Sequence, residues 1–269
     1  IAKEGVNGTL SGSKTDLENI IYYLKKIIKI RKLSVKISKN QFVPFYRLKI
    51  RIKKEIVTIG DTSINPEKIT GQYVTPLEWD RIIKNNEYLV IDTRNDYEID
   101  IGSFKNSINL KTKSFREFPL SIEKMNIQKD KPIAMFCTGG IRCEKASSYL
   151  IENGYKNVFQ LEGGILNYLE YHYNKKKINW NGECFVFDNR VAVNKKLKQG
   201  SYEQCYGCRH PITKSDMKLD SYVKGVSCRY CINRKNKKKL LASYERQKQI
   251  DYAETKDEKH SFKKIYGRN

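Results

Sequence analysis

The chain has 269 residues, enough for two or three domains that each bury a core. Only 39% of the residues are hydrophobic, but 18 Tyr and 10 Phe indicate a folded protein rather than a disordered one. No run of residues approaches the roughly 18–20 apolar positions of a membrane span, so we expect no membrane partner. The seven cysteines, four of them in two CxxC pairs, favour a reducing cytoplasm with metal and catalytic thiols over a disulfide framework.

The formal net charge of +22 is unevenly distributed. Residues 1–70 carry 15 Lys and Arg against 6 Asp and Glu, residues 71–180 carry 16 against 14, and residues 195–269 carry 20 against 8. A lysine-rich composition typical of AT-biased genomes would raise lysine everywhere and does not explain the near-neutral middle. Basic flanks around a neutral centre favour a polyanionic partner, and nucleic acid fits this pattern better than a membrane.

Residues 1–60 indicate a small α/β unit, and we expect it to begin upstream of Ile1. Ile1 lies in what the pattern predicts to be the end of a strand, and segments 33–38 and 45–52 alternate as further strands. Ser13 and Asp16 form a capping-box-like start of a helix. Its apolar residues recur at helical spacing, which predicts that one face packs on a sheet; they are Leu17, Ile20, Ile21, Leu24, Ile27 and Ile28.

A polar connector at 61–75 leads into alternating strand and helix patterns, which predict an α/β domain with a parallel sheet. The expected strands are 88–92, 133–136 and 158–161. The expected helices are 144–153 and 165–173. Functional groups of such sheets gather at the carboxyl ends of the strands, and Cys137 is predicted to lie at one of these ends.

The loop Cys137-Thr138-Gly139-Gly140-Ile141-Arg142 joins the predicted strand to the next helix. Its glycines permit a tight turn whose backbone N–H groups form an anion-binding nest, and the helix adds its positive end. Both effects favour a thiolate at Cys137; a buried structural cysteine is the weaker alternative. Protein phosphatases close a similar loop over a longer spacing, whereas four residues separate Cys137 from Arg142. The smaller cradle suits a persulfide sulfur rather than a phosphoryl group.

Two cysteine pairs near the C-terminus, Cys205/Cys208 and Cys228/Cys231, are separated by nineteen residues. This spacing is typical of a closed structural zinc site, with redox disulfides as the weaker alternative and His210 as a second-choice ligand. Tyr206 and Tyr230 could stack on bases. Basic residues around the pairs suit phosphate contacts, although a solvated basic face remains the alternative for about half of such residues; they are Arg209, Arg229, Arg234, Lys235 and Lys237.

Several motifs carry a family resemblance. CTGGIRCEKAS (137–147) resembles the active-site loop of rhodanese domains, and segments 91–110 and 161–169 resemble other rhodanese elements. AKEGVNGTLSG (2–12), the cysteine loop and WNGECFVFDNRVAV (180–193), in this order, resemble the tRNA uridine hydroxylase family. The resemblance implies an acylphosphatase-like α+β domain at 1–66, a central α/β rhodanese domain at 67–180, and a C-terminal extension at 181–269 with the zinc module and a basic tail.

The resemblance also implies an activity: oxygen-dependent formation of 5-hydroxyuridine at the wobble position of tRNA, with molecular oxygen as co-substrate and the anticodon region as the binding partner. It implies no protein partner. Cys137 would carry the reactive sulfur, as a thiolate or a persulfide, and Arg142 would close its cradle, supported by Thr138, Gly139, Gly140 and Ile141. Asp92 and Arg94 match the rhodanese Asp-x-Arg pattern, as a structural ion pair or as groups near the site. For Cys143, packing is favoured over resolution of a persulfide.

Two alternatives belong to other functional classes. A plain sulfurtransferase would move sulfur from a small donor, but such a donor needs no strongly basic flanks. A non-enzymatic RNA-binding zinc protein would need no reactive cysteine, and the intact Cys137 and Arg142 argue against it.

Overall fold

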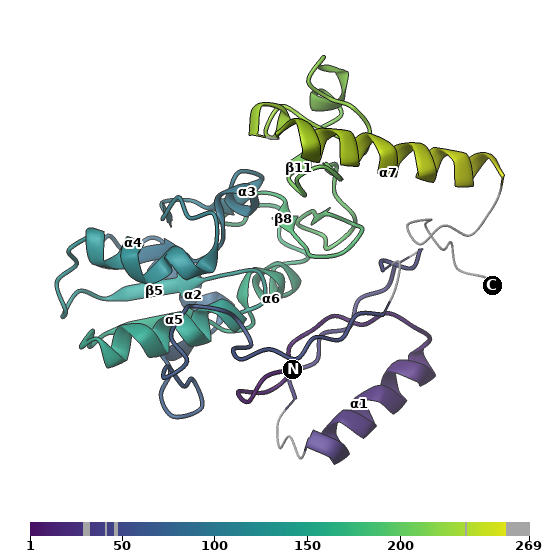
Figure 1. Cartoon of the computed structure of the whole chain (residues 1–269). Coiled ribbons are helices and arrows are strands. Elements are labelled where there is room, and N and C mark those ends of the chain that lie inside the picture. Colours follow the sequence, from purple (N-terminus) through teal and green to yellow (C-terminus); the bar gives the residue numbers. More distant parts are fainter. Residues whose placement is uncertain (29–32, 41, 46–47, 235, 257–269) are drawn as a thin grey trace. The chain divides into compact units, whose positions relative to one another are not determined.

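The computed structural model describes residues 1–28, 33–40, 42–45, 48–234 and 236–256 (Figure 1). The chain divides into two compact units. The larger unit combines residues 1–7 with 50–235, and the smaller one comprises residues 8–49 and 236–269. None of the helices in the described part of the chain is long and apolar enough to cross a membrane.

A five-stranded parallel sheet lies at the centre of the larger unit, with strand order β1-β6-β5-β2-β4. The strands are β1 (Gln72–Val74), β2 (Leu89–Asp92), β4 (Ile108–Asn109), β5 (Ile133–Phe136) and β6 (Val158–Leu161). The central strand β5 is buried along its whole length, as a strand covered on both faces must be. The predicted parallel α/β architecture is therefore confirmed.

Helices cover both faces of this sheet. One face is covered by α2 (Pro76–Ile82) and α6 (Gly164–Tyr171), and the other by α4 (Phe118–Lys124) and α5 (Ile141–Glu152). The larger unit also contains the short helix α3 (Asp96–Ile99) and 3-10 turns at Phe115–Glu117, Asp216–Lys218 and Ile232–Arg234. Side chains alternate across β5, so Ala134 and Phe136 join a core with α2 and α6. Ile133 and Met135 join the opposite core, with α4 and α5. β5 therefore lies between two hydrophobic cores.

Three small antiparallel pairs complete the larger unit. They are β3 (Gly102–Phe104) with β7 (Trp180–Gly182), β8 (Cys184–Phe185) with β9 (Ala192–Val193), and β10 (Glu203–Gln204) with β11 (Pro211–Ile212). The rings of Phe104 and Trp180 pack edge to face at 5.0 Å, which joins the segment after residue 180 to the core of the sheet. Gly182 adopts a φ of +80°, and a Cβ there would lie 2.3 Å from the carbonyl oxygen of Ile101, so the pairing requires glycine.

The smaller unit contains α1 (Lys14–Ile28) and α7 (Lys237–Thr255). The predicted first helix is confirmed, and Ser13 Oγ accepts a hydrogen bond from the Asp16 N–H. The predicted apolar stripe is half-buried at Leu17, Ile21 and Leu24, whereas Ile20 and Ile27 are exposed, and none of the described side chains of α1 is fully buried.

The two strands predicted at 33–38 and 45–52 are wrong for the residues that the structure describes. A strand exists only where a neighbour completes its ladder. Ile1 exchanges hydrogen bonds with Arg51 and Lys53, but the contact does not extend into a ladder. The side chains of Ile37 and Ile52 are 80% and 88% exposed, so the alternation of apolar residues has no sheet to cover.

Candidate active site and metal site

Cys137 directly follows β5 and is 1% exposed. The N–H of Gly140 donates to its Sγ at 3.1 Å, and Gly140 adopts a left-handed φ of +97° as the N-cap of α5. The first N–H groups of α6 hold the loop from the other side, because Ile165 N donates to the Cys137 carbonyl at 2.9 Å. A Cβ on Gly164 would lie 2.4 Å from that carbonyl oxygen, which explains the glycine at this position. Two helix N-termini therefore converge on the cysteine loop.

Arg142, in the first turn of α5, is held by a carboxylate that the sequence reasoning missed. Its Nη1 and Nη2 donate to Glu98 Oε1 and Oε2 at 2.6 and 2.7 Å. The side chains of Arg142 and Glu98 are only 9% and 0% exposed. Thr138 Oγ1 lies 3.5 Å from Glu98 Oε2. Glu98 therefore orients the arginine. In the sequence, Glu98 was indicated only by its place in the rhodanese-like segment 91–110.

Asp92 and Arg94 form a second ion pair, with both side chains completely buried. Arg94 Nε and Nη2 donate to the two Asp92 carboxylate oxygens at 2.9 and 2.6 Å. Arg94 also donates to the carbonyls of Glu98 and Gly102 at 3.2 and 2.7 Å. These bonds link the end of β2 to α3 and β3, so the pair has the geometry of a structural ion pair that fixes the helix carrying Glu98.

The electrostatics of the loop favour a thiolate. Burial raises the pKa of Cys137, but the Cys143 thiol, the Arg142 guanidinium and the N–H groups of Arg142 and Cys143 outweigh it and lower the pKa to about 5. Burial and the neighbouring Cys137 raise the pKa of Cys143 well above its ordinary value, so Cys143 acts as a neutral donor. Cys143 is fully buried and lies 3.6 Å from Thr93 Oγ1. These opposite shifts favour the thiolate form at Cys137 rather than at Cys143.

Lys145, one turn further along α5, anchors the N-terminal motif at residues 2–12. Its fully buried Nζ is hydrogen-bonded to Glu4 Oε1, lies 3.4 Å from Glu55 Oε2 and donates to the Ile64 carbonyl at 2.8 Å. A cavity of about 220 Å³ opens beside this cluster, next to the cysteine loop. Its lining residues are Glu4, Ile56, Pro66, Glu67, Ile141, Glu144 and Lys145. No role for Glu4 was indicated by the sequence, although Glu4 lies in the motif at residues 2–12.

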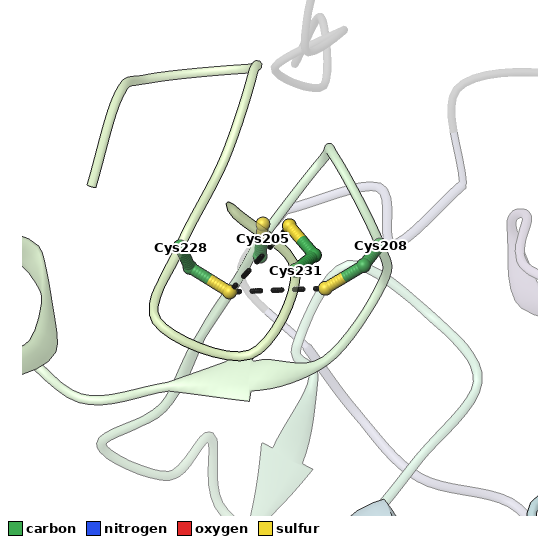
Figure 2. Close-up of side chains that lie close together, drawn as sticks. All are labelled: Cys205, Cys208, Cys228 and Cys231. Atoms are coloured by element: carbon green, nitrogen blue, oxygen red, sulfur yellow. Dashed lines mark hydrogen bonds between the residues drawn. The ribbon is translucent and has the colours of Figure 1, made fainter. Parts of the chain in front are cut away.

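The four C-terminal cysteines come together as predicted (Figure 2). Their four Sγ atoms all lie within 4.8 Å of one another, with Cys208 to Cys228 at 3.7 Å and Cys228 to Cys231 at 4.0 Å. Zn–S bonds of about 2.3 Å in a tetrahedron place sulfur atoms about 3.8 Å apart. The set could therefore hold a metal ion such as zinc, and it leaves no position open for catalysis. His210 stacks on Tyr230 at 3.6 Å and does not belong to the set.

The basic residues proposed for RNA contact have different surroundings. Arg209 donates to Gln204 Oε1 at 3.0 Å and lies 5.4 Å from the Tyr206 ring centre. Arg229 Nε lies 3.0 Å from Asp216 Oδ1, which offsets part of its charge. Arg234 is exposed in a 3-10 turn after the last cysteine. Two further residues are not brought to this module, since Lys237 begins α7 in the smaller unit and Lys235 lies outside the described residues.

Comparisons with known proteins identify two domains. Residues 1–56 match the UPF0176 acylphosphatase like domain, and residues 75–171 match the rhodanese-like domain. Among solved structures, a rhodanese-related protein from Thermoplasma volcanium is 28% identical, with 37% of this chain and 92% of that chain covered and a TM-score of 0.31. The Bacillus anthracis CoADR-RHD is 33% identical, with 36% and 16% covered and a TM-score of 0.31.

A polysulfide-sulfur transferase from Wolinella succinogenes is 26% identical, with 38% of this chain and 74% of that chain covered and a TM-score of 0.32. The two domain matches follow each other in the chain and flank the polar connector around residues 61–75. The chain therefore joins a UPF0176 N-terminal domain to a rhodanese-like domain, which is the architecture of the UPF0176 family.

Proposed function

We propose that the protein is a tRNA uridine hydroxylase that forms 5-hydroxyuridine at the wobble position. The observation that carries the proposal is the buried Cys137, whose pKa of about 5 makes it a thiolate inside a rhodanese loop. The motifs at 2–12, within the UPF0176 N-terminal domain, and at 180–193 also support the proposal, because they resemble the tRNA uridine hydroxylase family on both sides of that loop.

The net reaction uses molecular oxygen and a thiol reductant. One oxygen atom enters the C5–H bond of uridine, and the other leaves as water with two electrons and two protons from the reductant, which becomes a disulfide. Cys137 carries the reacting sulfur, as a thiolate or a persulfide. The Gly140 N–H and the Arg142 guanidinium stabilise negative charge on it, and Glu98 holds that guanidinium in place.

tRNA is the proposed partner because the positive charge lies on both flanks of the catalytic domain. Residues 195–269 carry 20 Lys and Arg against 8 Asp and Glu. Arg209 and Arg234 offer their guanidinium groups on the cysteine-rich module, which a structural zinc ion would hold together. Phosphate contacts of this kind position an RNA without reading its sequence, so the anticodon loop would be selected at the cysteine loop itself.

The proposal is tested by mass spectrometry of wobble nucleosides from cells that lack the protein. 5-Hydroxyuridine and nucleosides derived from it should fall, wild-type protein should restore them, and Cys137→Ser should not. A serine hydroxyl cannot replace a thiolate of low pKa. Unchanged wobble nucleosides in the deletion strain, with no second enzyme for the reaction, would contradict the proposal.

A sulfurtransferase is the second candidate. The observation in its favour is the short spacing between Cys137 and Arg142, with four residues between them, which makes a cradle for one sulfur atom. Thiosulfate and cyanide with the purified protein test this candidate. Sulfur transfer from thiosulfate to cyanide that is faster than nucleoside hydroxylation, and whose rate tRNA does not change, would favour the sulfurtransferase. A purely structural RNA-binding role would not require the arrangement of the cysteine loop, in which the Gly140 N–H donates to Cys137 Sγ and Glu98 holds Arg142.

A further inference from the structure

The segment at 180–193 places an aromatic ring in solvent beside the catalytic loop. Phe187 is 65% exposed, although the two residues before it in the chain, Phe185 and Val186, are 3% and 5% exposed. Its ring centre lies 5.9 Å from Cζ of Arg142, within the range of a cation–π contact. Phe187 is thus an exposed apolar ring that approaches the arginine closing the cysteine cradle.

The ring is mounted on a braced turn between β8 and β9. Arg190 Nε and Nη2 donate to Asp188 Oδ1 and Oδ2 at 2.9 and 2.6 Å, and both side chains are largely buried. The N–H of Val186 donates to the carbonyl of Val191 at 2.9 Å and closes the turn. This bracing fixes the backbone on both sides of Phe187, so the exposed ring is held in one place.

The inner edge of the ring is fixed through a chain of aromatic contacts. Phe187 meets Phe185 edge to face at 5.2 Å, and Phe185 meets Tyr97 at 5.2 Å. Tyr97 directly precedes Glu98 in α3, so the helix that orients Arg142 also supports the platform. The outer part of the ring remains accessible to a ligand.

We propose that Phe187 is the stacking platform for the target nucleobase, which it holds against the cysteine loop. This inference rests on the proposed function, since it concerns the base-binding part of the same site. An aromatic face stacks on any base, so the platform needs no hydrogen bond to the base itself. A base taken out of its own stack needs such a surface, whereas a small inorganic sulfur donor has no face to stack. Phe187 is therefore a substrate-binding residue and not part of the sulfur chemistry.

The test uses the full-length protein and two RNA stem-loops, one with uridine at the wobble position and one with an abasic site there. Loss of base–aromatic stacking weakens binding by about 5- to 150-fold. Wild type and Phe187→Trp should prefer the uridine stem-loop by a factor in this range. Phe187→Leu, which keeps an apolar side chain without an aromatic face, should bind both RNAs alike. Tyr171→Leu, which removes a 55% exposed aromatic on α6, is the matched control and should keep the preference.

A second readout separates stacking from a merely structural role. The rate of Cys137 alkylation by iodoacetamide, followed at that cysteine by mass spectrometry, should be the same in wild type and Phe187→Leu. An altered rate would show that Phe187 acts by covering Arg142, and would overturn the stacking role. The stacking role would also be overturned if Phe187→Leu still preferred the uridine stem-loop over the abasic one, or if wild type showed no such preference. Hydroxylation of the uridine stem-loop by wild type, measured in parallel, tests the proposed function independently of these outcomes.

Discussion

Glu98→Gln should destabilise the rhodanese-like domain far more than an exposed charge change. Arg142 donates to both oxygens of Glu98 at 2.6 and 2.7 Å, and the Glu98 side chain is completely buried. Glutamine can accept only one of these two bonds, and its amide N–H group would face the other guanidinium donor. The buried cation also loses its compensating charge. Breaking a buried ion pair by removing one partner costs about 3–5 kcal/mol of the free energy of unfolding.

The assay is urea unfolding at pH 7, followed by tryptophan fluorescence. The chain has two Trp, and both Trp79 and Trp180 are buried in the core formed with α2 and α6, so the signal reports on this domain. Glu170→Gln, an exposed change on α6, is the matched control and should stay within about 0.5 kcal/mol of wild type. A loss below about 1 kcal/mol for Glu98→Gln would refute the view that Glu98 and Arg142 are a mutually dependent buried pair.

The free energy of unfolding should depend on pH, and the direction follows from the sign of the pKa shift of Glu98. Burial raises its pKa, but Arg142 outweighs this effect and leaves the pKa lowered in the folded protein. A lowered carboxyl pKa stabilises the fold at pH values above the unfolded pKa of about 4.3, and this stabilisation is lost as the pH falls through the folded pKa. The difference between wild type and Glu98→Gln should therefore shrink on acidification.

Further outcomes are expected for the thiolate, the metal and the RNA. Alkylation of Cys137 should lose half its rate near pH 5, and Arg142→Leu should move this midpoint upward, because the guanidinium is one of the groups that lower the pKa. Metal analysis should find about one zinc per chain, lost in Cys208→Ser, and chelation should loosen residues 200–235 without changing the tryptophan signal. Affinity for tRNA should fall steeply with salt, and deletion of residues 236–269 should flatten that slope while leaving Cys137 alkylation unchanged.

The parts of the site that were predictable from the sequence are local in the chain. The cysteine loop is one short segment between a buried strand and a helix, and each CxxC pair lies within a single turn. The longer strands of the sheet, β2, β5 and β6, were predicted because apolar residues predominate in each of them. Local patterns of this kind can be recognised in a sequence even when the contacts between distant residues are unknown.

The parts that were not predictable depend on contacts across the chain. Glu98 meets Arg142 over a separation of 44 residues, and one glutamate among many carries no sign of its partner. The short strands β1 and β4 exist only because β6 and β2 pair with them. The strands expected at 33–38 and 45–52 have the right alternation but no neighbouring strand in the described structure. Phe187 would be read as core from its apolar segment, and only the structure shows that its ring is exposed beside Arg142.

The central claim is that the Cys137 thiolate supports hydroxylation of the wobble uridine. The most direct measurement supplies the purified full-length protein with unmodified tRNA, a dithiol reductant and isotopically labelled molecular oxygen, and analyses the wobble nucleoside by mass spectrometry. Wild type should form 5-hydroxyuridine with one labelled oxygen atom, and Cys137→Ser should not. Unmodified uridine from protein that carries its metal, and whose Cys137 reacts fully with iodoacetamide at neutral pH in a separate aliquot, would contradict a role of Cys137 in the hydroxylation.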